Sequence, residues 1–318
     1  MKLVMTLLVR NEADIVRENI DFHLTRGVDH VVAIDNGSTD GTRDILSDYA
    51  RQGLATVIDE PQQDHAQAEW VTAAALMARD ELGADWILNN DADEFWLPPS
   101  GNLKWDLVTA RSRKLICDRR HMFFAHDEKD DAGWLHRARY RIRRPIPFRR
   151  PTDIYDGKLD APYLYLQLPP KALVSARRLR SISQGNHNAL FEEQVEGSPS
   201  RITIYHFPIR SAAQFRLKVT QGGEAYLRNT KLPPGIGWHW RRWYRMLRTE
   251  GLHAALADAL PSAARLQQDL RKGDVLRDMT MLGHLGGRQP AECAVNPSRP
   301  SEAAARPARA PAPVPAPA

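Results

Sequence analysis

The chain has 318 residues and is 42% hydrophobic, enough to bury the core of one large domain or two fused domains. Its net charge of +5 fits anionic ligands, nucleic acid or an acidic membrane surface and selects none of them. Its two cysteines, Cys117 and Cys293, are too few for a disulfide framework or a structural zinc site. We therefore expect a protein of the reducing cytoplasm.

The first element is an apolar strand, predicted over residues 3–9. Arg10, Asn11 and Glu12 end this apolar run before it reaches the length of a signal-peptide core or a membrane span. We therefore expect no transmembrane segment, which leaves peripheral association with a membrane open.

Helices and strands alternate through the rest of the first hundred residues. Apolar residues recur at helical spacing over residues 12–26, and Gly27 ends that pattern. Further along, the patterns predict strands over residues 31–34, 55–58 and 86–89, a helix that ends at Tyr49 and a helix over residues 66–82. Such alternation predicts parallel βαβ units in an α/β sheet.

Residues 35–41 form a turn rich in aspartate, asparagine and glycine, where Thr39 or Asp40 can cap the next helix. These polar residues follow a strand, as do the acids after residue 89. Because open α/β sheets bind ligands at the carboxyl ends of their strands, both segments are candidate ligand sites.

The acids after residue 89 suggest a divalent cation. In an extended chain Asp91 and Asp93 share one face, Ala92 leaves room for a ligand, and Glu94 points the other way. Mg²⁺ and Mn²⁺ prefer hard oxygen ligands and keep positions for substrate phosphates. The short motif is also compatible with a solvated acidic turn.

The second half is less regular. Its patterns predict strands over residues 114–117, 122–125, 172–175 and 202–205, and helices over residues 211–229, 238–260 and 262–272. The Gly222-Gly223 pair is expected to break the first of these helices. Trp240, Trp243 and Tyr244 form an aromatic stripe typical of a core or a partner face. Residues 286–318 are rich in proline and alanine and should be disordered.

Arginines concentrate between Arg137 and Arg150, which invites a nucleic-acid interpretation. Pro145 and Pro147 interrupt the segment, and few stacking aromatics accompany it. A solvated or acceptor-facing loop is the better interpretation, and we expect no nucleic-acid partner.

Four ordered blocks resemble the family 2 glycosyltransferases. They are Leu-Val-Arg-Asn-Glu at residues 8–12, Gly-Val-Asp-His at 27–30, Ile-Asp-Asn-Gly-Ser-Thr-Asp-Gly-Thr at 34–42 and Asn-Asp-Ala-Asp-Glu-Phe at 90–95. They resemble most the branch with an Asp-Ala-Asp-Glu-Phe metal motif. Gly-Asn-His at 185–187 and residues 206–211, with Phe215 and Lys218, resemble later blocks of this branch more weakly.

The resemblance implies a GT-A fold, a mixed and mostly parallel sheet flanked by helices, with C-terminal helices added. It implies a nucleotide-sugar-binding half over residues 1–100 and an acceptor-side half of the same domain over residues 101–235. A helical extension over residues 236–285 and the tail would follow. The implied activity is metal-dependent, inverting transfer from a nucleotide sugar, by family default a UDP-sugar, to a glycan or small-molecule acceptor.

The resemblance also assigns roles on the donor side. Asn11 and Glu12 match residues beside the nucleoside, although either could instead cap the first helix. Asp35 matches the acid that contacts the base or ribose, with turn formation as its alternative. Arg210 and Lys218 could neutralise phosphate or remain ordinary surface charges.

Asp91 and Asp93 match the motif that binds Mn²⁺ or Mg²⁺, with Asp91 also facing the donor. His206 follows an apolar strand and could present a neutral ring nitrogen as a third ligand. A histidine at such a position can equally be structural.

The general base is the least defined residue, because the family's downstream Glu-Asp pair has no clear counterpart here. His187 is the first candidate, since an imidazole in a Gly-Asn-His-Asn loop can titrate near neutrality. The other candidates are Glu94, Asp153 and Glu192.

Two other classes of protein remain open. One is a nucleotidyltransferase-like or nucleotide-sugar-binding protein without glycosyl transfer, since a fold alone does not determine chemistry. The other is a basic adaptor that uses the arginine segment, the aromatic helices and the tail. The adaptor interpretation leaves Asp91 and Asp93 unexplained.

Overall fold

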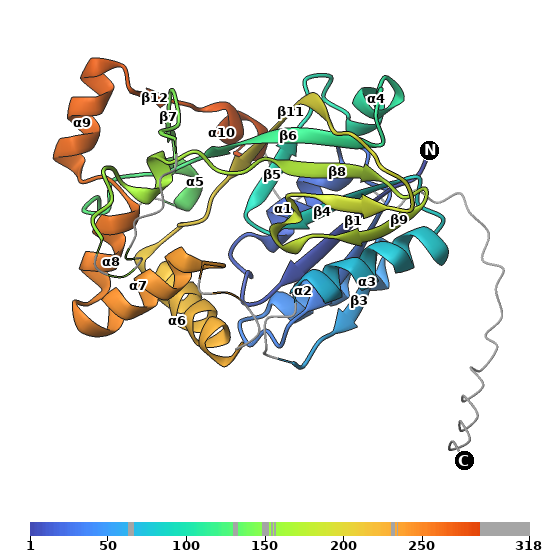
Figure 1. Ribbon diagram of the computed structural model, residues 1–318, viewed down its shortest axis with the longest axis horizontal. Helices are drawn as coiled ribbons and strands as arrows, with labels where there is room; N and C mark the ends of the chain where they lie inside the picture. Colours follow the sequence, from blue (N-terminus) through green and yellow to red (C-terminus); the bar gives the residue numbers. More distant parts are fainter. Residues whose placement is uncertain are drawn as a thin grey trace, which may run out of the picture. The chain divides into compact units, whose positions relative to one another are not determined.

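An eight-stranded sheet organises the chain, with strand order β3-β2-β1-β4-β8-β6-β11-β5. It is seen in a computed structural model that describes residues 1–62, 67–129, 133–147, 153, 155, 157–229, 233 and 235–286 (Figure 1). The tail expected to be disordered lies outside these residues from 287 onward, as do Arg149 and Arg150 of the arginine segment.

Four parallel strands form the N-terminal half of the sheet, as the alternating pattern predicted. They are β1 (Leu3–Val9), β2 (His30–Asp35), β3 (Ala55–Asp59) and β4 (Trp86–Asp91). The helices α1 (Val16–Leu24), α2 (Thr42–Arg51) and α3 (Gln67–Asp80) lie between them in the chain. Residues 12–15 precede the first helix rather than belonging to it, so the helix begins later than predicted, at Val16.

The second half of the sheet is mixed. Strand β8 (Lys171–Ser175) is antiparallel to both β4 and β6 (Lys114–His121), so β6 runs in the same direction as β4. Strand β11 (Ser198–His206) is parallel to β6 and antiparallel to β5 (Glu94–Leu97). The carboxyl ends of β1, β4, β6 and β11 therefore lie at one edge of the sheet.

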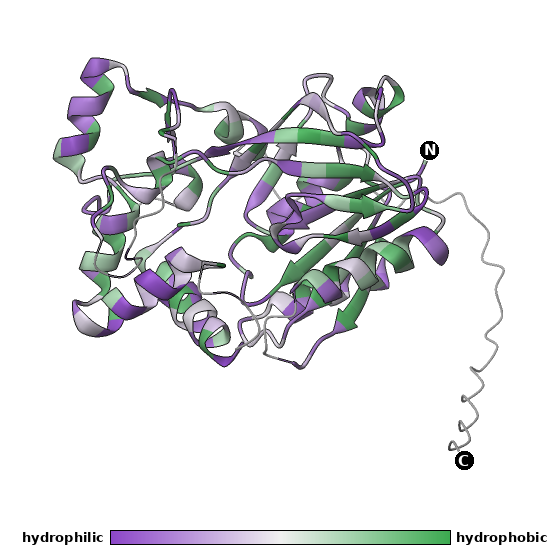
Figure 2. Cartoon of the chain, viewed as in Figure 1, coloured by the Kyte–Doolittle hydropathy of each residue, from purple (hydrophilic) through white to green (hydrophobic). Residues whose placement is uncertain are grey.

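Hydrophobic side chains cover both faces of the sheet. Met5 and Leu7 pack with α1 and α2, whereas Val4 and Val32 pack with α3 and the short strands β9 (Leu179–Ile182) and β10 (Ala189–Phe191). Figure 2 shows hydrophobic residues along these central strands. Burial on both faces explains the near-continuous apolar sequences of the parallel strands.

The remaining elements extend the first core cluster beyond the sheet. In chain order they are α4 (Leu103–Val108), α5 (Trp134–Arg137), β7 (Tyr140–Ile142), η1 (Tyr163–Tyr165), η2 (Gln184–Asn186), α6 (Ala212–Arg228), α7 (Trp238–Thr249), α8 (Leu252–Ala259), α9 (Ala263–Lys272), β12 (Val275–Arg277) and α10 (Thr280–Leu285). None of the helices in the described residues combines the length and apolar character that a bilayer crossing requires.

Two elements predicted in the second half differ from the observed ones. Residues 122–125 form no separate strand, because β6 continues to His121 and only Phe123 makes an isolated bridge. The helix expected over 238–260 is two helices, separated at Gly251, whose φ of 95° interrupts the helical path.

The Gly222-Gly223 pair lies inside helix α6 and does not break it. The two glycines instead allow close packing against a neighbouring helix. A methyl group added at Gly223 would lie 2.3 Å from Cγ of Tyr244, and one at Gly222 would lie 3.2 Å from the Trp240 ring. The glycines therefore let α6 approach the aromatic residues of α7.

The described arginines of the 137–150 segment are largely used within the fold. Arg137 is buried and donates to the carbonyl oxygen of Arg210, while Arg139 and Arg141 pair with Glu128 and Asp278. These arginines therefore stabilise the fold, and their contacts give no support to a nucleic-acid-binding role.

Candidate active site

Chemically active side chains converge at the sheet edge defined above. Asp91, His121 and His206 end strands β4, β6 and β11, and Lys171 begins the antiparallel strand β8 at the same edge. The strand directions alone bring these four residues together from positions far apart in the sequence.

The acids do not lie on an extended strand as predicted. Strand β4 ends at Asp91, and Ala92 and Asp93 form the turn into β5. The prediction that Glu94 points away is also wrong. Lys171 Nζ lies 2.7 Å from Glu94 Oε2 and pairs at the same time with Asp91, so the two carboxylates share one buried amine.

A second lysine pairs with the other acid of the motif. Lys218 Nζ, from helix α6, lies 2.9 Å from Asp93 Oδ2 and 2.7 Å from Glu12 Oε1. Burial raises the pKa of Asp93, but the charge of Lys218 outweighs it with help from His206 and Arg210, so this pKa lies well below its usual value. Asp93 is therefore ionised.

Two histidines approach Asp93. His206 Nε2 lies 3.4 Å from Asp93 Oδ1, and the His206 ring lies 4.9 Å from the ring of His121. Among the described residues, His206 Nδ1 and both ring nitrogens of His121 are buried without a hydrogen-bond partner. Burial, with the charges of His206 and Arg119, holds the pKa of His121 well below its usual value. The His121 ring is thus suited to act as a neutral nitrogen ligand, and His206 brings a second unpartnered ring nitrogen.

His121 was missed from the sequence because its strand was predicted to end at residue 117. The described residues contain no group of three acidic, histidine or cysteine side chains already disposed around a metal position. The donor types nevertheless fit Mn²⁺ or Mg²⁺, since carboxylate oxygens and unpartnered imidazole nitrogens meet at one place.

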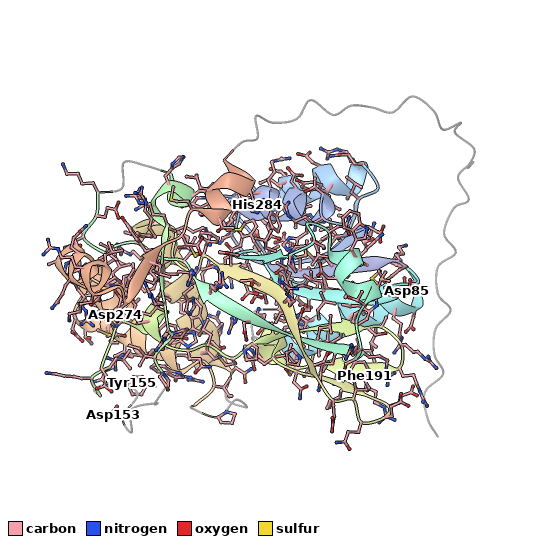
Figure 3. All side chains as sticks on the ribbon, turned by 90° about the horizontal axis from the view of Figure 1, so that it is seen from above. Asp85, Asp153, Tyr155, Phe191, Asp274 and His284 are labelled. Atoms are coloured by element: carbon pink, nitrogen blue, oxygen red, sulfur yellow. The ribbon has the colours of Figure 1, made fainter. Side chains whose placement is uncertain are left out.

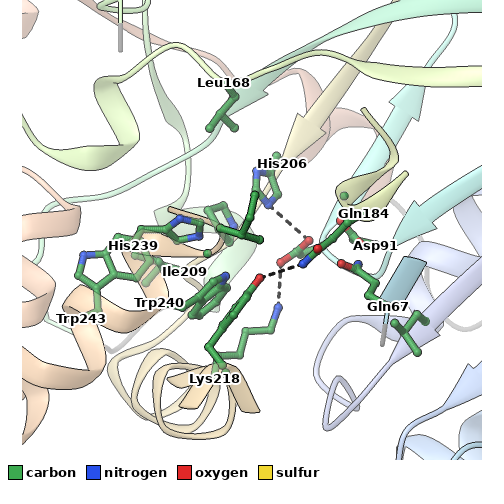
Figure 4. Close-up of a pocket in the computed structure, with 18 of the residues that line it drawn as sticks. Gln67, Asp91, Leu168, Gln184, His206, Ile209, Lys218, His239, Trp240 and Trp243 are labelled. Carbon is green, nitrogen blue, oxygen red and sulfur yellow. Dashed lines mark hydrogen bonds and ion pairs between the residues drawn. The ribbon is translucent and has the colours of Figure 1, made fainter. Parts of the chain in front are cut away.

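The two aspartates of the motif, the two histidines and the two lysines line a cavity of about 620 Å³ (Figure 4). One side is formed by the ends of β1 and β2 and by α3, through Val9, Asn36 and Trp70. The opposite side is aromatic and comes from residues outside any recognised block, among them Tyr163, Trp238, His239, Trp240 and Trp243. The expectation that the Trp240 stripe is core is right for Trp243, which is buried, but Trp240 also borders the cavity.

Asn11 and Asp35 hold the loop at residues 35–41 and do not line the cavity. Asn11, at φ 54°, accepts a hydrogen bond at Oδ1 from the Thr39 amide, 2.7 Å away. Asp35 Oδ1 accepts from the Ser38 amide at 3.1 Å, the turn contact that was its alternative role. Helix α1 has no side-chain cap, so the capping alternative for Asn11 and Glu12 is wrong.

Neither Thr39 nor Asp40 caps helix α2, because its N-cap is Gly41 and it has no side-chain cap; Asp40 instead contacts the first residue of the helix. Its Oδ1 accepts hydrogen bonds from the amide and hydroxyl of Thr42, at 3.1 and 2.6 Å. Its other oxygen accepts from the Ala13 amide at 3.0 Å, so it also fixes the exit of β1.

Arg210 lies behind the cavity rather than in it. Its side chain is 1% exposed, and its guanidinium donates to Glu12 at 2.5 Å and to Asp14 at 2.7 and 2.8 Å. Glu12 does line the cavity. Arg210 therefore links the exit of β11 to the exit of β1 and positions Glu12, which is a different role from direct phosphate contact.

Of the four candidate bases, only His187 lines the cavity. Glu94 is buried between Arg119 and Lys171, and Glu192 is exposed and paired with Arg178. Asp153 lies at one border of the molecule in the view of Figure 3, where its carboxylate accepts from the Tyr155 amide. None of these three acids is placed to reach a ligand in the cavity.

The His187 loop is tightly held. Asn186 donates through Nδ2 to the Asn89 carbonyl at 2.7 Å, which ties the loop to β4. His187 Nδ1 lies 2.9 Å from the Pro170 carbonyl oxygen, which can only accept. Nδ1 therefore carries the proton, and Nε2 keeps its lone pair. Burial lowers the pKa of His187, which keeps the ring neutral.

A mixed α/β sheet with acids, lysines and imidazoles at the carboxyl ends of its strands can bind a cation together with a phosphorylated ligand. Residues 7–156 match the model of glycosyl transferase family 2, the family that the four sequence blocks resemble. This match supports the glycosyltransferase activity that the sequence predicted. No curated protein matches the chain.

Similar solved structures include S. aureus TarS 1-349 in complex with UDP, at 13% identity and a TM-score of 0.38, over 78% of this chain and 72% of that one. Another is glucosyl-3-phosphoglycerate synthase from Mycobacterium tuberculosis in complex with Mn²⁺, UDP and glucosyl-3-phosphoglycerate. It is 21% identical, with a TM-score of 0.26, over 38% of this chain and 44% of that one.

Proposed function

We propose that the protein transfers a sugar, with inversion, from a nucleoside-diphosphate donor to a hydroxyl group of an acceptor. The observation that carries this proposal is the meeting of Asp91, Asp93 and two imidazoles with unpartnered nitrogens at one cavity. The divalent cation would be held by Asp91, Asp93 and His206, with His121 as a further nitrogen donor. The donor is a UDP-sugar by family default.

The chemistry needs charge neutralisation. When the bond between the sugar C1 and the phosphate oxygen breaks, negative charge develops on the departing nucleoside diphosphate. A bound cation would stabilise that charge. Lys171 and Lys218 border the same cavity and supply two further positive charges beside it.

His187 is the proposed general base. As the acceptor oxygen bonds to C1, the acceptor loses its proton, and Nε2 of His187 has the free lone pair to receive it. The Pro170 carbonyl would stabilise the resulting imidazolium through its Nδ1 hydrogen bond. No other predicted base borders the cavity in the described residues.

The acceptor would bind against the aromatic side of the cavity. Tyr163 and His239 stack at 4.9 Å between ring centres, and Trp240 lies beside them. Aromatic faces with polar ring atoms suit the C–H faces and hydroxyl groups of a sugar ring, and such contacts are compatible with a glycan or a small hydroxylated acceptor.

A thermal-shift screen tests the proposal. Nucleoside diphosphates and their sugars, each with and without Mn²⁺, should raise the melting temperature when they bind the folded protein. Donor turnover in the presence of Mn²⁺ should then fall by roughly 10²–10³-fold in Asp93→Asn, because a charge that stabilises the leaving group is lost. Asp80→Asn is the matched control, since Asp80 is exposed and pairs with Arg79 on the same helix.

The outcomes separate the alternatives. Absence of a shift with every nucleotide would contradict the proposal. Binding without turnover in the native protein would favour a nucleotide-sugar-binding protein. The anomeric configuration of the product, read by NMR, decides between inversion and retention.

A further inference from the structure

Each acid of the metal motif already has a lysine as its counter-ion. Lys171 lies between Asp91 and Glu94, and Lys218 lies between Asp93 and Glu12. The Lys171 side chain is 1% exposed and that of Lys218 is 19% exposed, and both residues line the cavity. One buried and one partly exposed amine thus hold the oxygens that a divalent cation would need.

Such pairs oppose a cation that arrives alone. The attraction between opposite charges is several times stronger away from bulk water than in solution. Each lysine is attracted by two carboxylates at once. A cation that binds Asp93 Oδ2 has to displace the Lys218 amine or accept its repulsion. The displaced lysine ammonium group would remain away from bulk water with less negative charge beside it.

A nucleoside diphosphate removes this conflict, because its oxygens offer the displaced amine a new anionic partner. Lys218 is the better placed of the two lysines to move. It projects from helix α6 on a flexible chain and is partly exposed, whereas Lys171 is enclosed and also neutralises Glu94 beside Arg119.

We propose that Lys218 is an exchangeable counter-ion, which neutralises Asp93 in the free protein and moves to the donor diphosphate when cation and donor bind together. This inference rests on the proposed function and adds a role to it. It implies that the cation binds weakly without nucleotide, and that each ligand strengthens the other by the same factor.

Calorimetric titration of Mn²⁺ into the native protein, with and without saturating UDP, measures that factor. We expect UDP to tighten Mn²⁺ binding at least tenfold. Equal Mn²⁺ affinity in the two titrations would contradict the inference without the use of any variant.

Lys218→Met isolates the contribution of the lysine. Methionine keeps the length of the chain and removes the charge, so Mn²⁺ alone should bind at least tenfold more tightly than to the native protein. UDP alone should bind more weakly, because its diphosphate loses the amine. Lys218→Arg keeps the charge and should bind Mn²⁺ alone as the native protein does.

Lys104→Met is the matched control, because Lys104 pairs with Asp29 at 2.6 Å but does not line the cavity. It should change neither affinity. Unchanged or weaker Mn²⁺ binding in a folded Lys218→Met variant would overturn the inference. If Lys218→Met does not give a cooperative melt, Lys218→Gln is titrated in its place, with the same expected results. Failure of the native protein to bind UDP at all would instead contradict the proposed function.

Discussion

The parallel half of the sheet and the mixed half supply opposite charges to the site. The acids lie at the exits of strands β1 and β4: Glu12 follows β1, Asp91 ends β4 and Asp93 follows it. Strands β8, β6 and β11 and helix α6 supply Lys171, His121, His206 and Lys218. The acids are close to one another in space because neighbouring parallel strands end together, and they are stable there because the second half brings the cations.

This difference shows that the acid motif is not a complete site. The parallel half alone would leave several carboxylates near one another with no compensating charge. The second half neutralises them, adds the ring nitrogens and encloses the cavity with aromatic residues. We therefore expect changes in the second half to affect catalysis and stability as strongly as changes in the acids.

The largest effect should come from His187→Gln, which tests whether the second half also supplies the base. Loss of a positioned base lowers the turnover number by roughly 10²–10⁴-fold, whereas donor binding in the half formed by β1 and β4 should be retained. Steady-state kinetics with the donor identified by the screen, together with calorimetric binding of UDP, measure both quantities.

His239→Gln is the comparison variant, because His239 also lines the cavity but stacks on Tyr163 in the aromatic wall. We expect it to raise the Michaelis constant for the acceptor more than it lowers the turnover number. A larger loss of turnover in His239→Gln than in His187→Gln would assign the base to His239.

Arg210→Met tests the link between the halves and should have the next largest effect. The buried Arg210 binds Glu12 and Asp14, so its removal leaves two carboxylates with less compensation and should lower the free energy of unfolding by about 3–5 kcal/mol. Urea denaturation measures the loss. Arg17→Met removes an exposed pair with Asp48 and should change it by less than about 1 kcal/mol. Equal losses would show that Arg210 does not hold the halves together.

The sequence predicted the first half well because its signals are local. Apolar runs of strand length, helical spacing and turn residues each depend on a few neighbouring positions. In open α/β sheets, ligands bind at the carboxyl ends of the strands, so the residues that follow each predicted strand are candidates. Asp91 and Asp93 were therefore identified as a pair, although the turn at Ala92 and the common partner of Asp91 and Glu94 were not.

The second half was predicted less well because its contacts are long-range. His121 was missed because β6 continues through charged residues that gave no apolar signal after Cys117. Tyr163 belongs to an irregular segment with no period, and nothing local indicates that it meets His239. Gly222 and Gly223 suggested a break in a helix, because their neighbour Tyr244 lies on another element.

Gly223→Ala should have an intermediate effect and tests how closely α6 must approach α7. The added methyl group would lie 2.3 Å from Cγ of Tyr244, so overpacking should lower the free energy of unfolding by about 1–3 kcal/mol despite the higher helix propensity of alanine. Gly283→Ala, in helix α10, places a methyl group with no atom within 4 Å and should be neutral or slightly stabilising. A stabilising Gly223→Ala would contradict close packing as the role of this glycine.

The smallest effect concerns the pH dependence of stability, through His23 in the first half. Its Nδ1 donates to the Asn19 carbonyl at 2.8 Å and its Nε2 accepts from the Trp96 amide at 3.2 Å, so only the neutral ring fits. Burial lowers the pKa of His23 to about 3, against about 6.5 in the unfolded chain. Between these values the unfolded state binds the extra proton, so stability falls as the pH is lowered.

The loss due to this group should approach about 1.4 kcal/mol per pH unit below pH 6.5. His23→Gln should therefore reduce the slope of unfolding free energy against pH between pH 5 and 6.5, measured by urea denaturation. The exposed His253, replaced by Gln, should leave the slope as it is in the native protein. If His23→Gln also leaves it unchanged, His23 does not contribute to the pH dependence, which then comes from other histidines whose pKa is lowered, such as His30, His121 and His239.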